Sequence, residues 1–118
     1  MTTTVLILGG EPPPPDLVRS VRHEADFLLA ADSGYDAFAA AGIEPDLLIG
    51  DFDSLATASE RIRCRKIHAP EETATDFEKA LRQLPAETQR LLILGGTGRR
   101  ADHFLNNLLI AAALDPAL

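Results

Sequence analysis

Two aspartates stand two residues apart at the end of a short apolar run in the stretch Asp46–Ser54. Residues 47–49 are all apolar, so we expect a buried strand there, after which Gly50 turns the chain. Residues i and i+2 of an extended chain point the same way, so the carboxylates of Asp51 and Asp53 should converge at the mouth of that strand. Like charges held this close repel each other unless a cation neutralises them. Mg²⁺ bound together with a phosphate-bearing substrate is the commonest such arrangement.

The alternative is that these aspartates only shape a turn and cap the next segment, which Asp and Ser do well. Three more acids, however, stand just after an expected strand or at the start of the helix that follows one. They are Asp32, Asp76 and Asp102. Taken singly, Asp76 and Asp102 fit helix starts, where a negative charge is stabilising anyway. Taken together with the pair at 51 and 53, the five acids favour a metal and phosphate site.

The elements that must position these acids are short apolar runs alternating with helical patterns. Strands are expected at Val5–Leu8, Phe27–Ala31, Leu47–Ile49, Arg90–Leu94 and, as a short edge strand, Lys66–His68. Helices are expected after Asp16 as N-cap, from Tyr35 to a C-terminal Gly42, from the capping box Thr75–Glu78, and over Phe104–Leu114. Residues 55–64 are weakly helical, and the proline run Pro12–Pro15 forms an extended connector.

Strands that alternate with helices, without hairpin signals, predict parallel βαβ units with helices on both faces of the sheet. We therefore expect an α/β fold, a three-layer Rossmann-like domain with a mostly parallel sheet. In such a sheet every parallel strand ends on the same edge, and ligands bind in the crevice outside the carboxyl ends. The five aspartates should consequently gather along one rim.

A glycine-rich stretch, Gly95–Ala101, follows the last expected strand and supplies the other half of the candidate site. Glycines after a strand let backbone N–H groups and a helix N-terminus approach a phosphate. Arg99 and Arg100 add cations that suit phosphate oxygens, although arginines on an exposed turn are more often solvated surface. His103 is a candidate acid, base or ligand, but a single histidine at a helix start more often has a structural role.

Composition limits the classes of function. A chain of 118 residues with 46% hydrophobic and 25% charged content fits one ordinary globular domain. A net charge of −7 argues against a duplex nucleic-acid partner, although a metal ion can bridge an acidic protein to a nucleotide. The single cysteine, Cys64, cannot form an internal disulfide, which favours a reducing compartment. Without a signal-peptide pattern or an apolar run of membrane length, we expect a cytoplasmic protein with no membrane partner.

Four motifs follow one another along the chain. They are Ala31-Asp32-Ser33-Gly34, similar to an acidic Asp-Gly-Gly turn; Pro45-Asp46 with Gly50-Asp51-Phe52-Asp53-Ser54; Thr75-Asp76 with Ala80-Leu81; and Thr97-Gly98 with Arg100, Asp102-His103, Leu105 and Asn107. In this order they resemble the thiamine pyrophosphokinase family, also called thiamin diphosphokinase. The resemblance covers most of the chain. Three positions depart from the family pattern, because Ser33 and Arg99 replace glycines and Thr73 stands where an acid often precedes Thr-Asp.

The resemblance implies a Mg²⁺-dependent enzyme that transfers pyrophosphate from its co-substrate ATP to the thiamine hydroxyl, giving thiamine diphosphate and AMP. It implies Mg²⁺ ligands at Asp51, Asp53 and Asp76, which form the catalytic set together with Asp102. The nucleotide- and phosphate-binding residues that it implies are Asp32, Ser33, Gly34, Thr75, Thr97, Gly98, Arg100, His103 and Asn107. Phosphoryl transfer fits such a site, because it depends on charge neutralisation and in-line placement more than on covalent help from the protein.

Family members continue into a β-sandwich domain that helps to form the thiamine pocket and a homodimer. The resemblance therefore implies that residues 1–118 are a single ATP-binding, catalytic α/β domain without the β-sandwich. We expect this domain to bind Mg²⁺ and a nucleotide but to handle thiamine poorly. Two alternatives remain open, namely a pyrophosphokinase acting on a hydroxymethylpterin and a non-catalytic nucleotide-binding or interaction module.

Overall fold

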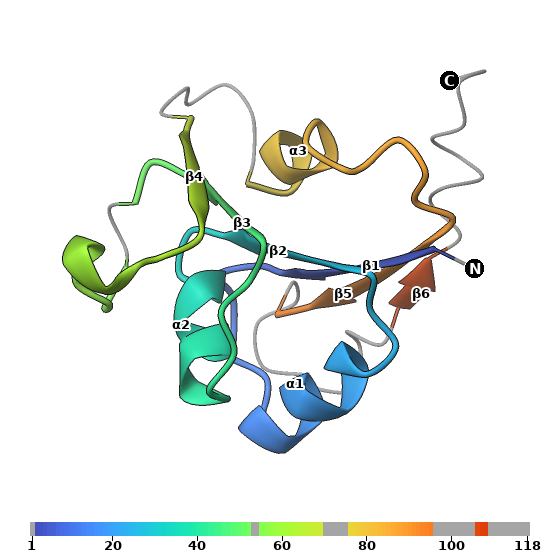
Figure 1. Cartoon of the computed structure of the whole chain (residues 1–118), viewed down its shortest axis with the longest axis horizontal. Helices are drawn as coiled ribbons and strands as arrows, with labels where there is room; N and C mark the ends of the chain where they lie inside the picture. Colours follow the sequence, from blue (N-terminus) through green and yellow to red (C-terminus); the bar gives the residue numbers. More distant parts are fainter. Residues whose placement is uncertain (1, 53–54, 70–75, 96–105, 109–118) are drawn as a thin grey trace.

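The described residues of the computed structural model, 2–52, 55–69, 76–95 and 106–108, form one sheet with helices on both faces (Figure 1). The strands are β1 Thr3–Ile7, β2 Phe27–Ala31, β3 Leu47–Gly50, β4 Arg65–His68, β5 Arg90–Leu94 and β6 Asn106–Leu108. Their order across the sheet is β4-β3-β2-β1-β5-β6. Neighbouring strands from β4 to β5 are parallel, and β6 runs antiparallel to β5. The prediction of a mostly parallel sheet is confirmed.

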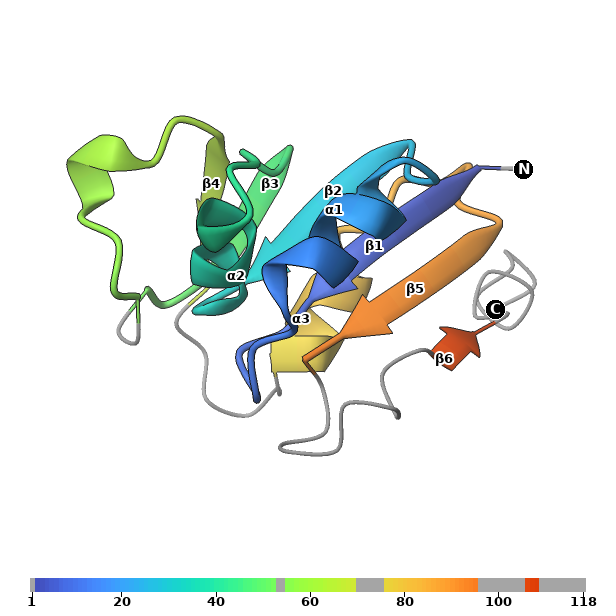
Figure 2. The ribbon, with the colours of Figure 1, turned by 90° about the horizontal axis from the view of Figure 1, so that it is seen from below.

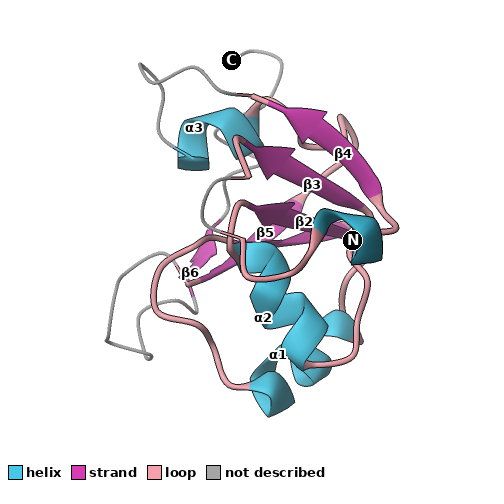
Figure 3. Cartoon of the chain, turned by 90° about the vertical axis from the view of Figure 1, so that its left-hand side faces the viewer, coloured by secondary structure: helices cyan, strands magenta, loops and turns pink. Residues whose placement is uncertain are grey.

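The helices of the described part lie in two layers. They are α1 Pro15–Arg22, α2 Gly34–Ala40 and α3 Asp76–Leu81, with one 3₁₀ turn, η1 Ser59–Arg61. Figure 3 shows α1 and α2 on one face of the sheet and α3 on the other, which confirms the three-layer prediction. None of these helices is long and apolar enough to cross a membrane.

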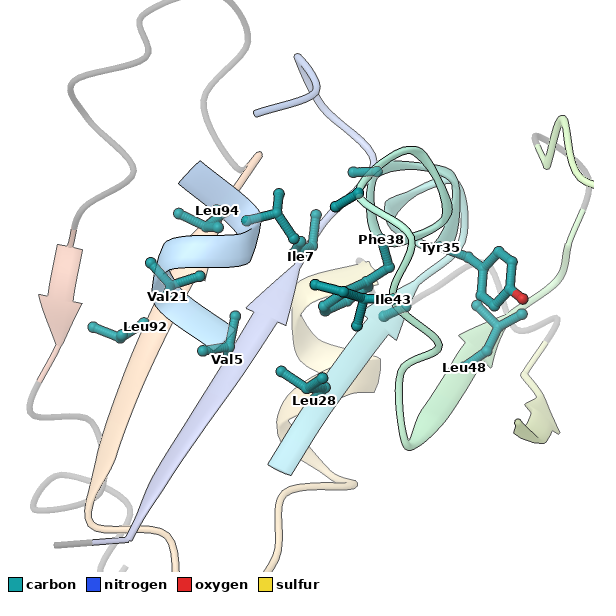
Figure 4. Packing of buried hydrophobic residues seen from close by; sticks show 14 of the residues in the cluster. Val5, Ile7, Val21, Leu28, Tyr35, Phe38, Ile43, Leu48, Leu92 and Leu94 are labelled. Atoms are coloured by element: carbon teal, nitrogen blue, oxygen red, sulfur yellow. The ribbon is translucent and has the colours of Figure 1, made fainter. Parts of the chain in front are cut away.

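The core has one part on each face of the sheet. On the face covered by α1 and α2, strand residues such as Ile7, Leu48 and Leu92 pack with Phe38, which is fully buried (Figure 4). Alternate strand residues face α3 and pack around its fully buried Ala80. Parallel strands covered on both faces are expected to be continuously apolar, which explains why runs such as Phe27–Ala31 were readable from the sequence.

The order of the strands reverses at β1. From β1 the chain proceeds outward through β2, β3 and β4, whereas β5 pairs with the opposite side of β1. Figure 2 shows the arrowheads of β2 and β5 pointing toward the same edge. Ligands of open α/β sheets bind outside the carboxyl ends at such a switch point. The topology therefore predicts a ligand site beside the chain segments that follow β1 and β5.

The predicted C-terminal glycine of α2 is confirmed. Gly42 has φ +76°, its N–H donates to the carbonyl of Ala39 at 2.9 Å, and the N–H of Ile43 donates to the carbonyl of Phe38 at 3.0 Å. This pair of bonds is the Schellman motif, which ends a helix on a left-handed residue. Ile43 and Phe38 also belong to the same core cluster, so the cap directs the chain back toward β3.

Two predictions about helices were wrong in detail. The N-cap of α1 is Pro14 and not Asp16, which lies in the first turn of the helix. Proline favours the first helical position because its missing N–H has no helical partner there, and Pro15 occupies that position. Within residues 55–64, the described structure is helical only in the 3₁₀ turn Ser59–Arg61.

The helix expected over Phe104–Leu114 is contradicted at Asn106–Leu108, where the chain forms β6. These residues pair antiparallel with Ile93, Leu92 and Leu91 of β5. A short apolar run does not distinguish a buried helix from a strand by periodicity alone, and here the free edge of β5 determines the outcome. The first strand also lies earlier than expected, at Thr3–Ile7, because Thr3 and Thr4 already pair with Arg90 and Leu91.

Candidate functional site

Asp32 follows β2 directly, and only 5% of its surface is exposed. Its backbone has φ +49°, a left-handed conformation that aspartate tolerates better than most residues. Its N–H donates to the carbonyl of Ile49 at 2.9 Å, and its carboxylate Oδ1 accepts the N–H of Phe52 at 3.1 Å. The first of the predicted rim acids therefore ties the end of β2 to the end of β3.

We call residues 50–52, the described part of the motif at residues 50–54, the acidic turn. Gly50 has φ +142°, and a Cβ atom built on it would lie 2.1 Å from Oδ1 of Asp32. Only glycine fits there, because both the backbone conformation and the contact exclude a side chain. Asp51, next in the chain, is half-buried, and Asp53 and Ser54 lie outside the described residues.

Phe52 corrects one step of the sequence-based prediction. The convergence of Asp51 and Asp53 assumed an extended chain, but Phe52 between them has φ +68°. The left-handed turn directs the Phe52 N–H to Asp32, and the Phe52 ring lies against the imidazole of His68 with centroids 5.4 Å apart. A bulky residue in this conformation persists only where its surroundings hold it, which these two contacts do.

Two of the other predicted nucleotide-binding residues, Ser33 and Gly34, lie with Asp32 between β2 and α2. A Cβ atom on Gly34 would lie 2.0 Å from the carbonyl oxygen of Ile7, so glycine lets α2 begin directly beside the end of β1. Ser33 has φ −68°, and its hydroxyl donates to the carbonyl of Gly9 at 3.4 Å. Serine at this position therefore requires no strained backbone.

The segments after β1 and β5 meet at the switch point. Leu8 donates its N–H to the carbonyl of Leu94 at 2.9 Å, and Gly10 donates to the carbonyl of Gly95 at 2.8 Å. Sequence reasoning singled out the glycines after β5 but missed Gly10, although two consecutive glycines after a strand were an available signal. The remaining predicted residues of the closing segment, Thr97, Gly98, Arg100, Asp102 and His103, together with Arg99, lie outside the described residues.

Helix α3 begins at Asp76 and packs its Ala80 on the face opposite α2. The side chains of Asp76 and Asn107 are outside what the structure describes, as are Thr75 and Thr73. Among the described side chains, no group of three or more His, Cys, Asp or Glu could hold a metal ion. That search includes Asp32 and Asp51 but neither Asp53 nor Asp102, so the expected metal ligands stay a prediction.

A cavity of about 550 Å³ lies between the proline run and α2. Its lining consists of Gly10, Pro12, Pro13, Pro14, Pro15, Ser33, Asp36, Ala37 and Ala40. Ser33 thus belongs to both the cavity and the predicted nucleotide site. A cavity of this size is within the range of small-molecule sites, which are mostly apolar with a few polar groups.

Glu44 holds a second polar cluster that the sequence analysis did not identify. Its carboxylate accepts the hydroxyl of buried Tyr35 at 2.7 and 2.9 Å, and the N–H groups of Arg63 and Cys64 at 2.9 and 2.8 Å. Burial opposes the charged form of Glu44, but these hydrogen bonds outweigh it and lower the pKa of the carboxyl. Burial and the neighbouring Glu44 charge raise the pKa of Tyr35, and they raise the pKa of Cys64 to about 11.

Comparison with known proteins gives a consistent result. Residues 18–116 match the family described as thiamin pyrophosphokinase, catalytic domain. Thiamine pyrophosphokinase from Bacillus subtilis (strain 168) is 36% identical over 92% of this chain and 53% of its own length. A crystal structure of thiamine pyrophosphokinase from Bacillus subtilis covers 99% of this chain with 30% identity and a TM-score of 0.66, the match spanning 58% of that chain.

A thiamin pyrophosphokinase family protein from Enterococcus faecalis is similarly related. It is 28% identical, with a TM-score of 0.64 over 98% of this chain and 55% of its own. The present chain thus spans little more than half the length of the relatives it matches. The family match covers most of the chain, and the fold positions the acidic turn and the residues after β2 at one sheet edge. The chain belongs to the thiamin pyrophosphokinase family, of which it carries the catalytic domain.

Proposed function

We propose that this chain is the ATP-binding, catalytic domain of a Mg²⁺-dependent thiamine pyrophosphokinase. The contact between Asp32 and the acidic turn carries the proposal. There a nearly buried carboxylate accepts the Phe52 N–H at 3.1 Å and leaves Gly50 no room for a side chain. This contact ties the end of β2 to the acidic turn, and an acid at the carboxyl edge of the sheet also suits a site for cations and phosphates. The family of the named relatives supports the same conclusion.

In this proposal Asp51, Asp53 and Asp76 hold Mg²⁺. Their donors are all carboxylate oxygens, which suit a small hard cation. Asp51 follows the carboxyl end of β3, the next residue Phe52 donates its N–H to Asp32, and α3 begins at Asp76, so the described backbone supports this proposal. When bound, Mg²⁺ neutralises charge on the phosphate oxygens of ATP. The segments after β1 and β5, which meet through the hydrogen bond from the Gly10 N–H to the Gly95 carbonyl, lie at the switch point where this proposal places those phosphates.

The proposed reaction forms one bond and breaks one. The hydroxyl oxygen of thiamine bonds to the β-phosphorus of ATP, and the bond from that phosphorus to the oxygen bridging the α-phosphate breaks. AMP leaves with the electron pair, and one aspartate of the catalytic set, Asp51, Asp53, Asp76 or Asp102, accepts the hydroxyl proton. The contribution of the protein is placement and charge compensation, with Arg100 and His103 as further phosphate contacts.

Calorimetric titration of ATP into the chain, with and without Mg²⁺, tests the binding step. We expect binding that requires Mg²⁺ and that weakens by at least roughly tenfold in Asp51→Asn, because one anionic ligand is lost. Asp16→Asn is the matched control, since Asp16 is exposed on α1 and, within the described part of the chain, pairs with Arg19 at 2.6 Å. If the wild-type chain bound no ATP in either condition, the proposal would be wrong.

Measuring AMP release with different acceptors then separates the proposed activity from its alternatives. Thiamine-dependent AMP supports the proposal, hydroxymethylpterin-dependent AMP supports the other pyrophosphokinase, and ATP binding without AMP supports a non-catalytic module. The homodimer and the cytoplasmic location remain predictions. Sedimentation of the chain with and without ATP would test the dimer.

A further inference from the structure

The cavity between the proline run Pro12–Pro15 and α2 has one rigid wall. Each proline ring fixes the φ angle of its own residue, and none of the four prolines has a backbone N–H that needs a partner. Both ends of this wall are held. The Gly10 N–H donates to the carbonyl of Gly95 at 2.8 Å, and the carbonyl of Pro14 accepts the N–H of Val18 in α1 at 3.2 Å. The wall therefore has little freedom to close onto α2.

The opposite wall is one face of α2 with mostly short side chains. Four residues spaced three or four apart share that face and line the cavity, namely Ser33, Asp36, Ala37 and Ala40. Their size leaves a space of about 550 Å³ between the helix and the proline rings. A mostly apolar, preformed cavity with a few polar groups is the usual form of a small-molecule site.

Asp36 is the charged group of this cavity. Its Oδ2 accepts the N–H of Ala56 at 2.9 Å, and its Oδ1 accepts the N–H and the hydroxyl of Thr57 at 3.0 and 2.5 Å. Within the described part of the chain, these bonds use three of the roughly four acceptor positions of a carboxylate, so Oδ2 can accept one more. A carboxylate fixed in this way favours a hydroxyl or amino group of a ligand and repels a phosphate.

The cavity adjoins the switch point of the sheet. Gly10 lines the cavity and donates its N–H to Gly95, and Ser33 lines it and donates its hydroxyl to the carbonyl of Gly9 at 3.4 Å. The proposed function places the phosphates of ATP at this edge. A nucleotide that binds there by its phosphates has its sugar and base beside the cavity, while Asp36 keeps the phosphates outside it.

We infer that the cavity is the nucleoside subsite of the nucleotide site. The base lies between the proline rings and the methyl groups of Ala37 and Ala40. Oδ2 of Asp36 accepts a ribose hydroxyl, and the phosphates extend past Gly10 toward Gly95. An acid that binds a ribose hydroxyl beside the phosphates is known from other nucleotide-binding α/β sheets. The inference rests on the proposed function, for which it names the part of the site that recognises adenosine.

Calorimetric titration of adenosine without Mg²⁺ tests the cavity alone. Ala40 lines the cavity and is exposed, so Ala40→Leu fills the space without entering the core. Ala39 is exposed on the same helix and is not part of the lining, so Ala39→Leu is the matched control. We expect roughly millimolar or tighter binding by the wild type and by Ala39→Leu, and binding weaker by at least roughly tenfold in Ala40→Leu.

Titration of ATP and of inorganic tripolyphosphate, both with Mg²⁺, separates the nucleoside subsite from the phosphate site. Tripolyphosphate has the phosphate chain of ATP without the nucleoside. We expect the wild type to bind ATP at least roughly tenfold more tightly than tripolyphosphate. Ala40→Leu should remove most of this preference and bind tripolyphosphate within about twofold of the wild type.

Equal affinity of the wild type for ATP and tripolyphosphate would overturn the nucleoside subsite and leave the proposed phosphate and Mg²⁺ site standing. Unchanged adenosine binding in Ala40→Leu would do the same. Equal weakening in Ala39→Leu and Ala40→Leu, with an equal fall in the urea midpoint, would also overturn it, because damage to α2 would explain both results.

Two further outcomes distinguish the occupant and the proposed function. Binding of thiamine in place of adenosine, lost in Ala40→Leu, would assign the cavity to the acceptor and overturn the inference. Adenosine binding that is lost in Ala40→Leu, without Mg²⁺-dependent binding of ATP or tripolyphosphate, would support the cavity as a nucleoside site and overturn the proposed function.

Discussion

Gly50 and Gly42 both have positive φ angles, but their surroundings differ. A Cβ atom on Gly50 would lie 2.1 Å from Oδ1 of Asp32, whereas no atom lies within 4 Å of the same position at Gly42. Gly50→Ala should lower the free energy of unfolding by about 3 kcal/mol, since backbone strain adds to overpacking. Gly42→Ala should cost only about 1 kcal/mol, because strain acts alone. Urea unfolding of both variants measures the difference.

The same pair of variants tests whether Asp32 matters for ligand binding. Gly50→Ala must displace the Asp32 carboxylate or the acidic turn, so ATP binding in the presence of Mg²⁺ should weaken. Gly42→Ala, at the far end of α2, should leave that affinity unchanged. If Gly50→Ala and Gly42→Ala lowered the free energy of unfolding equally, the Asp32 carboxylate would be able to move away from Gly50 without loss of stability. That result would contradict a fixed position of Asp32 at the proposed site.

Cys64 gives the chain a predictable sensitivity to alkaline pH. Burial and the Glu44 charge raise its pKa from 9.0 to about 11, so between these values the unfolded chain has lost the thiol proton and the folded chain retains it. The Cys64 thiol therefore makes its full contribution to the free energy of unfolding below pH 9, and this contribution is lost as pH rises toward 11. We expect a loss of about 1–2 kcal/mol, reduced from the full linkage value because Cys64 is partly exposed.

Replacing the thiol tests the assignment of that loss. In Cys64→Ala, the fall in unfolding free energy between pH 9 and pH 10 should become smaller. Tyr35, whose pKa is also raised, continues to contribute above its ordinary value of 10.0. If Cys64→Ala showed the same dependence of unfolding free energy on pH as the wild type, groups other than Cys64 would be responsible for the alkaline loss of stability.

At the level of residues, the sequence indicated the chemistry but not the contacts. Asp32 and Asp51 were identified from their place after apolar runs, because chemistry of this kind needs acids at strand ends. Asp36 and Glu44 were not, since their partners lie about 20 residues away along the chain. No local sequence pattern predicts that a carboxylate will bind backbone N–H groups distant in the chain.

Among the elements, β2 and β5 occur at the predicted bounds, because each is an apolar run that ends at a turn residue. The wrong predictions concern elements whose secondary structure depends on the strands that lie beside them in space. The run containing Asn106–Leu108 has helical composition, yet it pairs with the edge of β5. Pairing with a strand distant in sequence, as here, is the information that a single sequence reveals least.

Two strands are preceded by aspartates that bind the neighbouring strand in the same way. Asp26 accepts the Thr3 N–H at 2.8 Å and donates its own N–H to the Thr3 carbonyl at 2.7 Å. Asp46 accepts the Leu28 N–H at 2.7 Å and donates to the Leu28 carbonyl at 2.8 Å. Each acid thus fixes the register of the strand that it precedes against the strand beside it.

Removing one of these carboxylates should therefore destabilise the sheet. Asp46→Ala should cost about 2 kcal/mol, because it leaves a backbone N–H without its charged acceptor. Asp46→Asn keeps an acceptor oxygen and should cost less than about 1 kcal/mol. Asp16→Ala, at an exposed ion pair, should change urea stability by no more than about 0.5 kcal/mol. A loss for Asp16→Ala equal to that for Asp46→Ala would mean that net charge, and not register, is responsible.

In the whole molecule, the proposed nucleotide site depends on several strands at once. The Gly9–Gly10 turn after β1, Asp32 after β2, the acidic turn after β3 and Gly95 after β5 all lie on the carboxyl edge of one sheet. The parallel order of these strands is what brings segments from all over the chain together. Nucleotide binding should accordingly be a property of the folded domain that no isolated segment reproduces.

This gives a prediction for the two substrates of the proposed reaction. ATP with Mg²⁺, at about 100 times its dissociation constant, should raise the unfolding free energy of the chain by about 2.7 kcal/mol. Thiamine alone should stabilise the chain far less. The chain spans 53% of the length of its Bacillus subtilis relative, and the family resemblance assigns part of the thiamine pocket to a β-sandwich domain.

Thermal unfolding with each ligand, alone and combined, measures both effects, and Asp51→Asn is the control that should remove the response to ATP. Stabilisation by thiamine without ATP, together with rapid formation of thiamine diphosphate, would place the whole acceptor pocket within these 118 residues. A response to ATP alone would instead locate the donor half of the reaction at the carboxyl edge of this sheet. The acceptor half would then require surfaces beyond the sheet edge described, and adding a separately produced β-sandwich domain of a relative should restore turnover.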